Sequence, residues 1–439
     1  MNAGTDTIVA VATPPGTGGI GIVRLSGAGV REIAALLLGS VPEPRHATAA
    51  TFRDPGGDVV DRGIALFFEG PRSFTGEDVL ELQGHGGPVI LAALVDAAVA
   101  FGARRAAPGE FTQRAFENDR LDLAQAEAVA DLINSGTRQA AQAALRSLAG
   151  DFSDAVDALA AALMTLRVHV EAAIDFPEEE IDYLADAALA ARIGACATSF
   201  DDLQARVSVG RVLRDGFQVV LVGKPNAGKS SLMNRLSGEE TAIVTEIAGT
   251  TRDILRETID VDGLAIEIVD TAGLREDPGV VEQEGIRRAR RAMAEADAVL
   301  WVRDATDPAP GELEGLPPGV PVLALDNKCD LAGGTSHDGL PVSALTGAGL
   351  PALRERLKGL AGYTNLGEGA FTARRRHVEA LARAREHFGQ GREALAQSGA
   401  GELFAEELKL AQEELGTITG AVTTEDLLGR IFGEFCIGK

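Results

Sequence analysis

The feature that most constrains the fold of this 439-residue chain is a short apolar run followed at once by a glycine-rich turn. The run FQVVLV, residues 217–222, has the length and composition of a buried strand. GKPNAGKS follows at residues 223–230, and the next residues, SLMNRLSG, have the composition of a helix. A turn of the form G-x-x-x-x-G-K-S between a strand and a helix predicts a phosphate-binding loop, because its glycines let backbone N–H groups approach phosphates.

Two polar residues of this loop have expected roles. Lys229 should reach the β and γ phosphates of a nucleotide, and the Ser230 hydroxyl should bind Mg²⁺. The predicted nucleotide contacts in the loop are Asn226, Ala227, Gly228, Lys229, Ser230 and Ser231.

Two further segments predict the rest of the phosphate and magnesium site. DTAG ends the apolar run AIEIVD about forty residues after the loop, so the Asp270 carboxylate should hold Mg²⁺ through water and the Gly273 N–H should face the γ-phosphate. TEIAGTTRD lies between them, and we expect Thr251, with Thr250 beside it, to close over Mg²⁺. The predicted contacts here are Thr245, Glu246, Ile247, Ala248, Gly249, Thr250, Thr251, Asp270, Thr271, Ala272 and Gly273.

The choice of base is predicted by NKCD, residues 327–330, which follows the apolar run PVLAL. The Asp330 carboxylate can accept two hydrogen bonds from guanine, whereas adenine would leave it unpaired at a cost of about 1–3 kcal/mol. Lys328 should pack over the base, and residues 343–345 should add backbone contacts. The predicted contacts are Asn327, Lys328, Asp330, Ser343, Ala344 and Leu345. Together these motifs predict a GTPase.

The usual water-orienting residue is missing from the expected hydrolytic site. Many small GTPases place a glutamine directly after DTAG, but this chain has Leu274, which cannot orient water. The nearby polar candidates are Arg275, Glu276 and Glu282, and a carboxylate among them could act on the attacking water.

The pattern of apolar and turn-forming residues changes three times along the chain. Up to about residue 118, short apolar runs alternate with Gly/Pro-rich turns, which predicts an α+β region. Apolar residues at helical spacing then run to about residue 212, and they return after about residue 362. The α/β region between them is either inserted into one helical domain or separates two helical modules.

Composition narrows the class of protein. The net charge of −24 disfavours broad binding to nucleic acid, although a local basic surface or a basic partner is compatible with it. The three distant cysteines suggest neither a disulfide framework nor a zinc site. No apolar run is long enough to span a bilayer and the start of the chain is unlike a signal peptide, so we expect a cytoplasmic protein.

With these residues in view, the chain resembles the MnmE (TrmE) family of tRNA-modifying GTPases over its whole length. The resemblance depends on DTIVAVATPPGTGGIGIVRLSG, SFTGEDVLELQGHGG, APGEFTQRAFENDRLDLAQAEAVADLI, GKPNAGKSSLMN, IAGTTRD, DTAGLRE and the terminal FCIGK. It implies a folate-binding and dimerisation domain at 1–119, a helical domain at 120–213 and 364–439, and an inserted Ras-like, doubly wound GTPase domain at 214–363.

The resemblance also implies roles for particular residues. A K⁺ ion would bind at Asn226, Thr245, Ile247 and Thr250, and the catalytic carboxylate would be Glu282. A 5-formyl- or methylene-tetrahydrofolate would contact Arg24, Glu81, Arg120 and Lys439, because a carboxylate can pair with the pterin edge and basic groups can hold the glutamate tail. Cys436 matches the C-terminal cysteine of the family.

The implied reaction adds an aminomethyl-type group, such as carboxymethylaminomethyl, to carbon 5 of the wobble uridine of certain tRNAs. The implied partners are tRNA, a second copy of the chain, and an MnmG-like protein that carries FAD. Basic clusters at 287–291 and 374–376 are either RNA contacts or solvated helix faces. The alternatives are a ribosome-assembly GTPase switch and a folate-dependent methyltransferase with a regulatory GTPase; neither is excluded by the nucleotide motifs alone.

Overall fold

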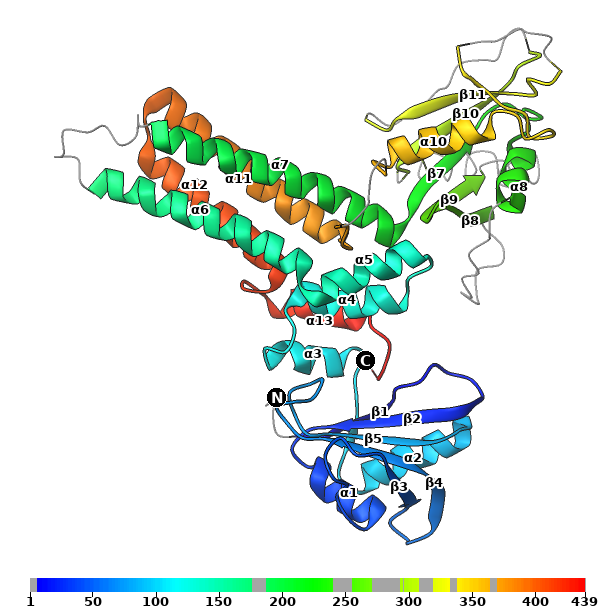
Figure 1. Ribbon diagram of the computed structural model, residues 1–439, viewed down its shortest axis with the longest axis vertical. Helices are drawn as coiled ribbons and strands as arrows, with labels where there is room; N and C mark the ends of the chain where they lie inside the picture. The colour runs from blue at the N-terminus through cyan, green and yellow to red at the C-terminus, as the bar shows by residue number, and fades with distance from the viewer. Residues whose placement is uncertain are drawn as a thin grey trace, which may run out of the picture. The chain divides into compact units, whose positions relative to one another are not determined.

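The computed structural model describes residues 6–175, 187–239, 255–270, 293–294, 296–307, 319–331, 338–363 and 369–438. These residues form two compact units (Figure 1). The first contains residues 1–130 and 416–439, and the second contains residues 131–415.

A six-stranded sheet forms the centre of the first unit. Its strands are β1 (Ile8–Val11), β2 (Gly18–Ser26), β3 (Thr48–Arg53), β4 (Val59–Phe68), β5 (Val79–Gly86) and β6 (Arg104–Arg105), in the order β3-β4-β5-β2-β1-β6. The pairing is antiparallel except between β1 and β6. Because strands are pleated, alternate residues point to opposite faces of the sheet.

The two faces of this sheet differ. One face packs with α1 (Val30–Leu38) and α2 (Pro88–Ala100) around buried side chains such as Phe67 and Leu82. On the opposite face, α3 (Glu110–Glu117) covers the β1 side through Phe111, which packs with Ile8. The rest of that face is only partly covered within the described chain, and Ile64 is 42% exposed.

The C-terminal segment folds onto the first unit. In α13 (Glu425–Gly433), Phe432 packs with Leu123 at the start of α4 (Leu123–Ile133), and the following residues pair through a bridge between Ile437 and Pro108. Gly438 has a φ of 96°, and a Cβ there would lie 2.1 Å from the Val11 carbonyl oxygen. Only glycine fits this close approach, so the end of the described chain is fixed beside β1.

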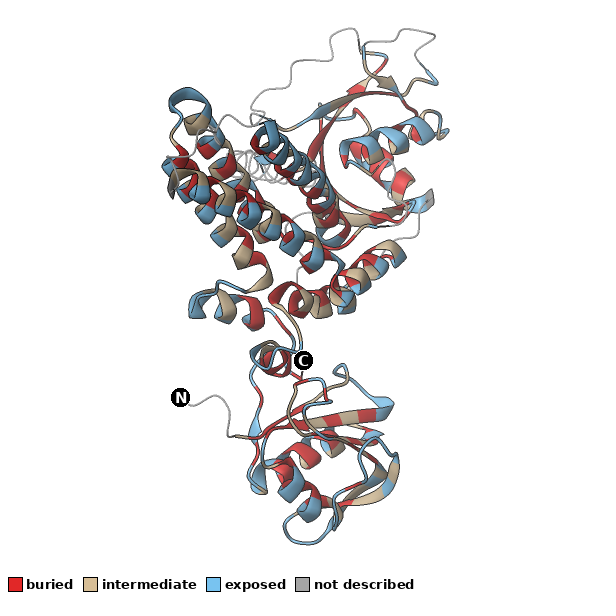
Figure 2. Cartoon of the chain, turned by 60° about the vertical axis from the view of Figure 1, so that its left-hand side comes forward, coloured by how far each residue is buried: buried red, intermediate tan, exposed pale blue. Residues whose placement is uncertain are grey.

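Long helices make up the helical part of the second unit. They are α5 (Arg138–Ala149), α6 (Asp151–Asp175), α7 (Ala187–Asp215), α11 (Arg375–Ser398) and α12 (Gly401–Thr419), whose last residues belong to the first unit. Most buried residues of these helices are the apolar positions of their amphipathic sequences. Figure 2 shows helices with buried and exposed stripes.

Helices from before and after the α/β region share one core. The rings of Phe152 and Phe371 stack with their centroids 4.7 Å apart, and those of Phe200 and Phe388 lie 5.3 Å apart. The Ser147 hydroxyl also accepts a hydrogen bond from the Thr372 amide at 2.9 Å. These contacts join residues that precede the α/β region to residues that follow it, and Ser147 and Thr372 are 225 positions apart, so the α/β region is an insertion between two parts of one helical core.

The inserted region contains a second six-stranded sheet. Its strands are β7 (Phe217–Val222), β8 (Leu255–Val261), β9 (Leu264–Asp270), β10 (Ala298–Asp304), β11 (Val322–Asn327) and β12 (Leu340–Pro341), in the order β12-β11-β10-β7-β9-β8. Only β8 is antiparallel to its neighbour. The core includes side chains of α8 (Lys229–Glu239) and α10 (Leu350–Leu360). This order is that of a Ras-like doubly wound domain, in which ligands bind at the carboxyl ends of the parallel strands.

The expected fold class is therefore confirmed: an α+β domain, a helical domain, and a doubly wound α/β domain. The predicted domain boundaries at 119/120, 213/214 and 363/364 stay predictions. No helix in the described part of the chain combines the length and apolarity required to cross a bilayer.

A buried carboxylate connects three segments of the helical unit, and its removal provides a test. Asp131, 8% exposed, accepts hydrogen bonds from Arg214 at 3.0 Å and from Arg374 at 2.8 Å. Asp131→Ala should lower the free energy of unfolding by about 3 kcal/mol, because it removes the carboxylate that pairs with buried Arg374 and with Arg214. Urea denaturation measures the change. The control is Glu379→Gln, which breaks an exposed pair with Arg375 and should cost less than about 0.5 kcal/mol; equal effects would contradict the prediction.

Candidate functional site

The glycine-rich turn lies between the end of β7 and the start of α8. Gly223 has a φ of 152°, and a Cβ there would lie 2.1 Å from the Val302 carbonyl oxygen. At Gly228 the φ is 93° and a Cβ would lie 2.2 Å from Asn327 Nδ2. Larger residues would collide with neighbouring strands and loops at both positions, so the glycines keep the backbone open toward a ligand.

The lysine of the turn points into the turn itself. Lys229 is 7% exposed, and its Nζ donates hydrogen bonds to the carbonyl oxygens of Gly223 at 2.8 Å and Lys224 at 3.0 Å. Ser230 and Ser231 are exposed in the first turn of α8, where backbone N–H groups and the helix dipole favour an anion. Asn226 is exposed, with a φ of 65°.

Asn327 connects two of the predicted nucleotide-binding segments. It is 1% exposed; its Nδ2 donates to the Ala227 carbonyl at 2.8 Å, and its Oδ1 accepts from the Ala344 amide at 3.0 Å. The predicted nucleotide contact of Asn327 stays a prediction, and the structure adds an architectural role for this residue. One side-chain amide fixes the phosphate-binding loop and the 343–345 loop relative to each other.

The other described residues of the base site lie close to this amide. Asp330 and Leu345 are exposed, and Leu345 is 78% exposed. Ser343 is fully buried, and its hydroxyl accepts a hydrogen bond from the Thr346 amide at 3.1 Å. Ser343 therefore shapes the loop, whereas Asp330 has an accessible carboxylate.

Two carboxylates at this site are not predicted by the motifs. Asp304, at the end of β10, accepts a hydrogen bond from Lys328 Nζ at 2.6 Å, and Asp307 pairs with Lys224 at 2.9 Å. Burial would raise the pKa of Asp304, but hydrogen bonds from Lys328 and Thr306 outweigh it and lower the pKa to about 2. Asp304 therefore fixes the lysine expected over the base. The sequence signal was the aspartate that ends the apolar run AVLWVRD.

Several predicted residues lie outside the described part of the chain. They are Thr245, Glu246, Ile247, Ala248, Gly249, Thr250, Thr251, Thr271, Ala272, Gly273, Arg275, Glu276, Glu282, Lys439 and the 287–291 cluster. Asp270 is the last residue of β9, so its backbone lies at the same carboxyl edge of the sheet as the phosphate-binding loop. The described residues contain no group of three His, Cys, Asp or Glu side chains able to hold a metal.

The first unit brings two of the predicted folate contacts together. Arg24 on β2 and Glu81 on β5 are directly opposite each other, with Arg24 Nε 2.9 Å and Nη2 2.8 Å from Glu81 Oε1. Both bonds use the same carboxylate oxygen. Arg24 also lies over the Phe111 ring, 5.9 Å from its centroid.

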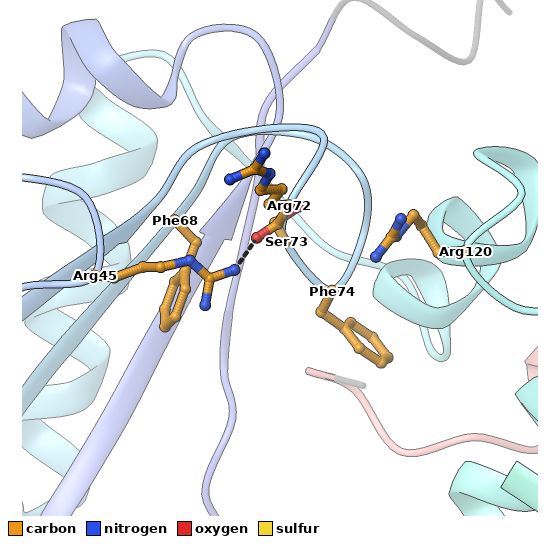
Figure 3. A pocket seen from close by; sticks show the side chains of 6 residues that line it. All are labelled: Arg45, Phe68, Arg72, Ser73, Phe74 and Arg120. Carbon is orange, nitrogen blue, oxygen red and sulfur yellow. Dashed lines mark hydrogen bonds between the residues drawn. The ribbon is translucent and has the colours of Figure 1, made fainter. Parts of the chain in front are cut away.

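Arg120 lines a separate pocket of about 430 Å³ in the first unit. Its other lining residues are Arg45, Phe68, Arg72, Ser73 and Phe74 (Figure 3). Cys436 is an exposed free thiol just before the bridge between Ile437 and Pro108. Gly438 lies against Val11, which pairs with Val23, so the C-terminal segment ends near Arg24.

The prediction that residues 374–376 form one basic surface cluster is wrong for Arg374. Arg374 is 8% exposed and bonds to Asp131, so it can be neither a solvated charge nor an RNA contact. Arg375 is exposed and pairs with Glu379. The helix beginning at Arg375 turns the first guanidinium into the core.

Comparisons with known proteins agree over the whole chain. Residues 7–120 match the model of the GTP-binding protein TrmE N-terminus, and residues 123–436 match the model of the MnmE helical domain. The tRNA modification GTPase MnmE of Alkalilimnicola ehrlichii is 56% identical, covering 99% of both chains. That of Pseudomonas aeruginosa is 53% identical, covering 100% of both.

Solved structures match part of the chain, among them a G domain. The chain is similar to the G domain of the T. maritima FeoB iron transporter, at 25% identity over 33% of this chain and 98% of that chain, with a TM-score of 0.25. A TM-score this low adds nothing to the family matches.

Because the Asn327 side-chain amide bridges two loops, substitutions of Asn327 and Asp330 should differ in their effect on stability. Asn327→Ala should lower the free energy of unfolding by about 2–3 kcal/mol, because it removes two buried hydrogen bonds and leaves their partners unsatisfied. Asp330→Asn changes an exposed side chain and should cost less than about 0.5 kcal/mol. Urea denaturation measures both, and hydrogen exchange of the Ala344 amide should accelerate only in Asn327→Ala. An unchanged exchange rate of the Ala344 amide in Asn327→Ala would show that the Asn327 side chain does not hold the 343–345 loop.

Proposed function

This chain belongs to the MnmE family of tRNA modification GTPases, and from that premise we propose the reaction that it serves. It hydrolyses GTP to drive addition of an aminomethyl-type group, such as carboxymethylaminomethyl, at carbon 5 of the wobble uridine of certain tRNAs. A tetrahydrofolate supplies the one-carbon unit, and an MnmG-like FAD protein is the partner. The observation that carries this proposal is the identity of more than half of all residues with a tRNA modification GTPase over the full length of the chain.

The described phosphate-binding turn, around Gly223 and Gly228, has room for the phosphates of GTP, and Lys229 lies within it. Ser230, together with Thr251, would hold Mg²⁺, with Asp270 acting through water. The metal would neutralise charge on the β and γ phosphates. Asp330 would accept both guanine donors, with Lys328 packed over the base.

Hydrolysis requires a substitute for the glutamine that Leu274 replaces. We assign water orientation to Glu282, because a carboxylate can polarise a water molecule directly or through a second water. A K⁺ ion held by Asn226, Thr245, Ile247 and Thr250 would supply positive charge between the phosphates. Asn226 fits this role, since its exposed amide lies on the phosphate-binding loop.

The first unit fits a folate in two respects. Arg24 uses only Glu81 Oε1, so Oε2 can accept from the amidine-like edge of a pterin. Arg120, on the same unit, offers a guanidinium for the carboxylates of the folate tail, and Lys439 follows the fixed Gly438. The folate would provide one-carbon chemistry, while these residues bind and orient it.

A second copy of the chain would cover the open face of the first sheet. Ile20 is 69% exposed and Ile64 is 42% exposed, and both lie on strands whose opposite face is packed by α1 and α2. Burying such apolar side chains stabilises association. A homodimer would also give the proposed folate site a second wall.

The reaction is tested in a strain that lacks this gene. Mass analysis of tRNA should show wobble uridines without the aminomethyl-type group, and the native gene should restore it. Lys229→Ala should not restore it, because the phosphate-binding lysine is lost. Glu379→Gln, an exposed change on α11, should restore it fully. An unchanged nucleoside profile in the deletion strain would exclude this reaction and favour a ribosome-assembly switch.

The role of K⁺ is tested by hydrolysis assays in KCl and NaCl at equal ionic strength. The native protein should be about tenfold or more faster in K⁺, because a cage of carbonyl oxygens sized for K⁺ fits Na⁺ poorly. Asn226→Ala should remove the difference between the salts and keep most nucleotide affinity, since its amide serves the ion. Equal native rates in both salts would instead point to an arginine, with Arg252 or Arg275 the first to test.

A further inference from the structure

We propose that Arg45 and Arg72 extend the folate site into a subsite for a chain of γ-linked glutamates, so that the protein prefers polyglutamylated folates. This inference rests on the proposed use of a folate. It adds two residues for which neither the motifs nor the family resemblance gives a role.

The pocket concentrates positive charge in a chain whose net charge is −24. Arg45, Arg72 and Arg120 all line it, and in Figure 3 the guanidinium groups of Arg45 and Arg120 approach it from opposite sides. No carboxylate of the described chain pairs with any of the three guanidinium groups. Like charges gathered without a counter-ion destabilise the folded state, so an anionic ligand would relieve a cost that is already present.

Three carboxylates in the segment 69–78 are already engaged with other arginines. Glu69 binds Arg31 Nη2 at 2.6 Å, and Asp78 binds Arg31 Nε at 2.7 Å. Glu77 accepts from Arg114 Nη1 at 3.1 Å. The loop that carries Arg72 therefore has acidic residues at both ends, yet they neutralise other arginines and leave the pocket basic.

The pocket walls are fixed by contacts from two sides. A guanidinium nitrogen of Arg45 donates to the Arg72 carbonyl, and the Asn118 amide donates to the Thr75 carbonyl at 2.7 Å. A Cβ on Gly76 would lie 3.3 Å from the Arg120 Cγ, so the loop lies directly against the Arg120 side chain. The three cations therefore have a prearranged framework, which reduces the entropy lost on binding.

Strand register connects this pocket to the proposed pterin contact. Leu66 pairs with Glu81 and Phe68 pairs with Val79, so Phe68 and Glu81 are diagonal neighbours on one face of the sheet. Such neighbours lie about 7–8 Å apart. A folate whose pterin pairs with Glu81 could direct its aryl group toward Phe68 and Phe74 and its tail toward the arginines.

Carboxylates suit this pocket better than the phosphates of RNA. Its volume of about 430 Å³ is within the range of small-molecule sites, roughly 300–1,000 Å³. Planar guanidinium groups bind carboxylates and phosphates alike in a bidentate manner, and each additional γ-linked glutamate would bring one more carboxylate into this small pocket. The strongly acidic chain also disfavours an extended contact with a phosphate backbone.

The test compares 5-formyltetrahydrofolate with its triglutamate by isothermal titration calorimetry on the full chain. The native protein should bind the triglutamate about tenfold or more tightly, with the advantage shrinking as KCl is raised. Arg72→Gln and Arg45→Gln should reduce this advantage to about threefold or less and leave monoglutamate affinity within about threefold. Arg53→Gln is the matched control, because it removes an exposed cation of the same sheet that bonds only to the Gly57 carbonyl.

Each other outcome overturns the inference. Equal native affinity for both folates would leave the folate proposal standing and exclude the subsite, whereas no native binding of either folate would remove both. If the variants lose affinity for both folates equally, the two arginines contact the part of the ligand that the monoglutamate already contains. A loss of tRNA affinity with unchanged folate binding would make the pocket an RNA contact. If Arg45→Gln does not fold, because it loses the hydrogen bond to the Arg72 carbonyl, Arg72→Gln decides alone.

Discussion

A single buried amide organises the nucleotide site. Asn327 ends β11, and through Ala227 and Ala344 it connects segments that the chain separates by 100 and 17 residues. Buried polar groups are stable only when they are paired, so this side chain has few other arrangements available. The glycine at position 228 is required because the same amide lies where its side chain would be.

The order of the parallel strands explains why the loops of the nucleotide site lie close to one another. Parallel strands β7, β9, β10 and β11 end at one edge of the sheet, so the residues that follow them meet there. Asp304 and Asp307 use this edge to hold Lys328 and Lys224. The site therefore combines a rigid sheet with loops that are fixed by side chains.

Charge is unevenly distributed across the described chain. In the helical unit, buried Arg374 and exposed Arg214 both pair with Asp131, and in the first unit Arg31 and Arg114 are paired with carboxylates. The pocket of Arg45, Arg72 and Arg120 differs, because its cations are not paired with carboxylates. In an otherwise acidic protein, this contrast distinguishes a ligand site from structural ion pairs.

The sequence by itself determined the fold class, the phosphate-binding loop, the order of the guanine-specific motifs and the family. Those signals are contiguous strings, in which strand, turn and helix propensities act over neighbouring residues. It also placed Arg24 and Glu81 in one site by resemblance.

Only the tertiary structure decided which residues work together. It showed that Asn327 is a bridge, that Asp304 holds Lys328, that Arg374 is buried, and that Arg45, Arg72 and Arg120 share one pocket. None of these follows from local periodicity, because each depends on contacts between residues far apart in the chain. Strand register and packing set those contacts, and a single sequence does not display them directly.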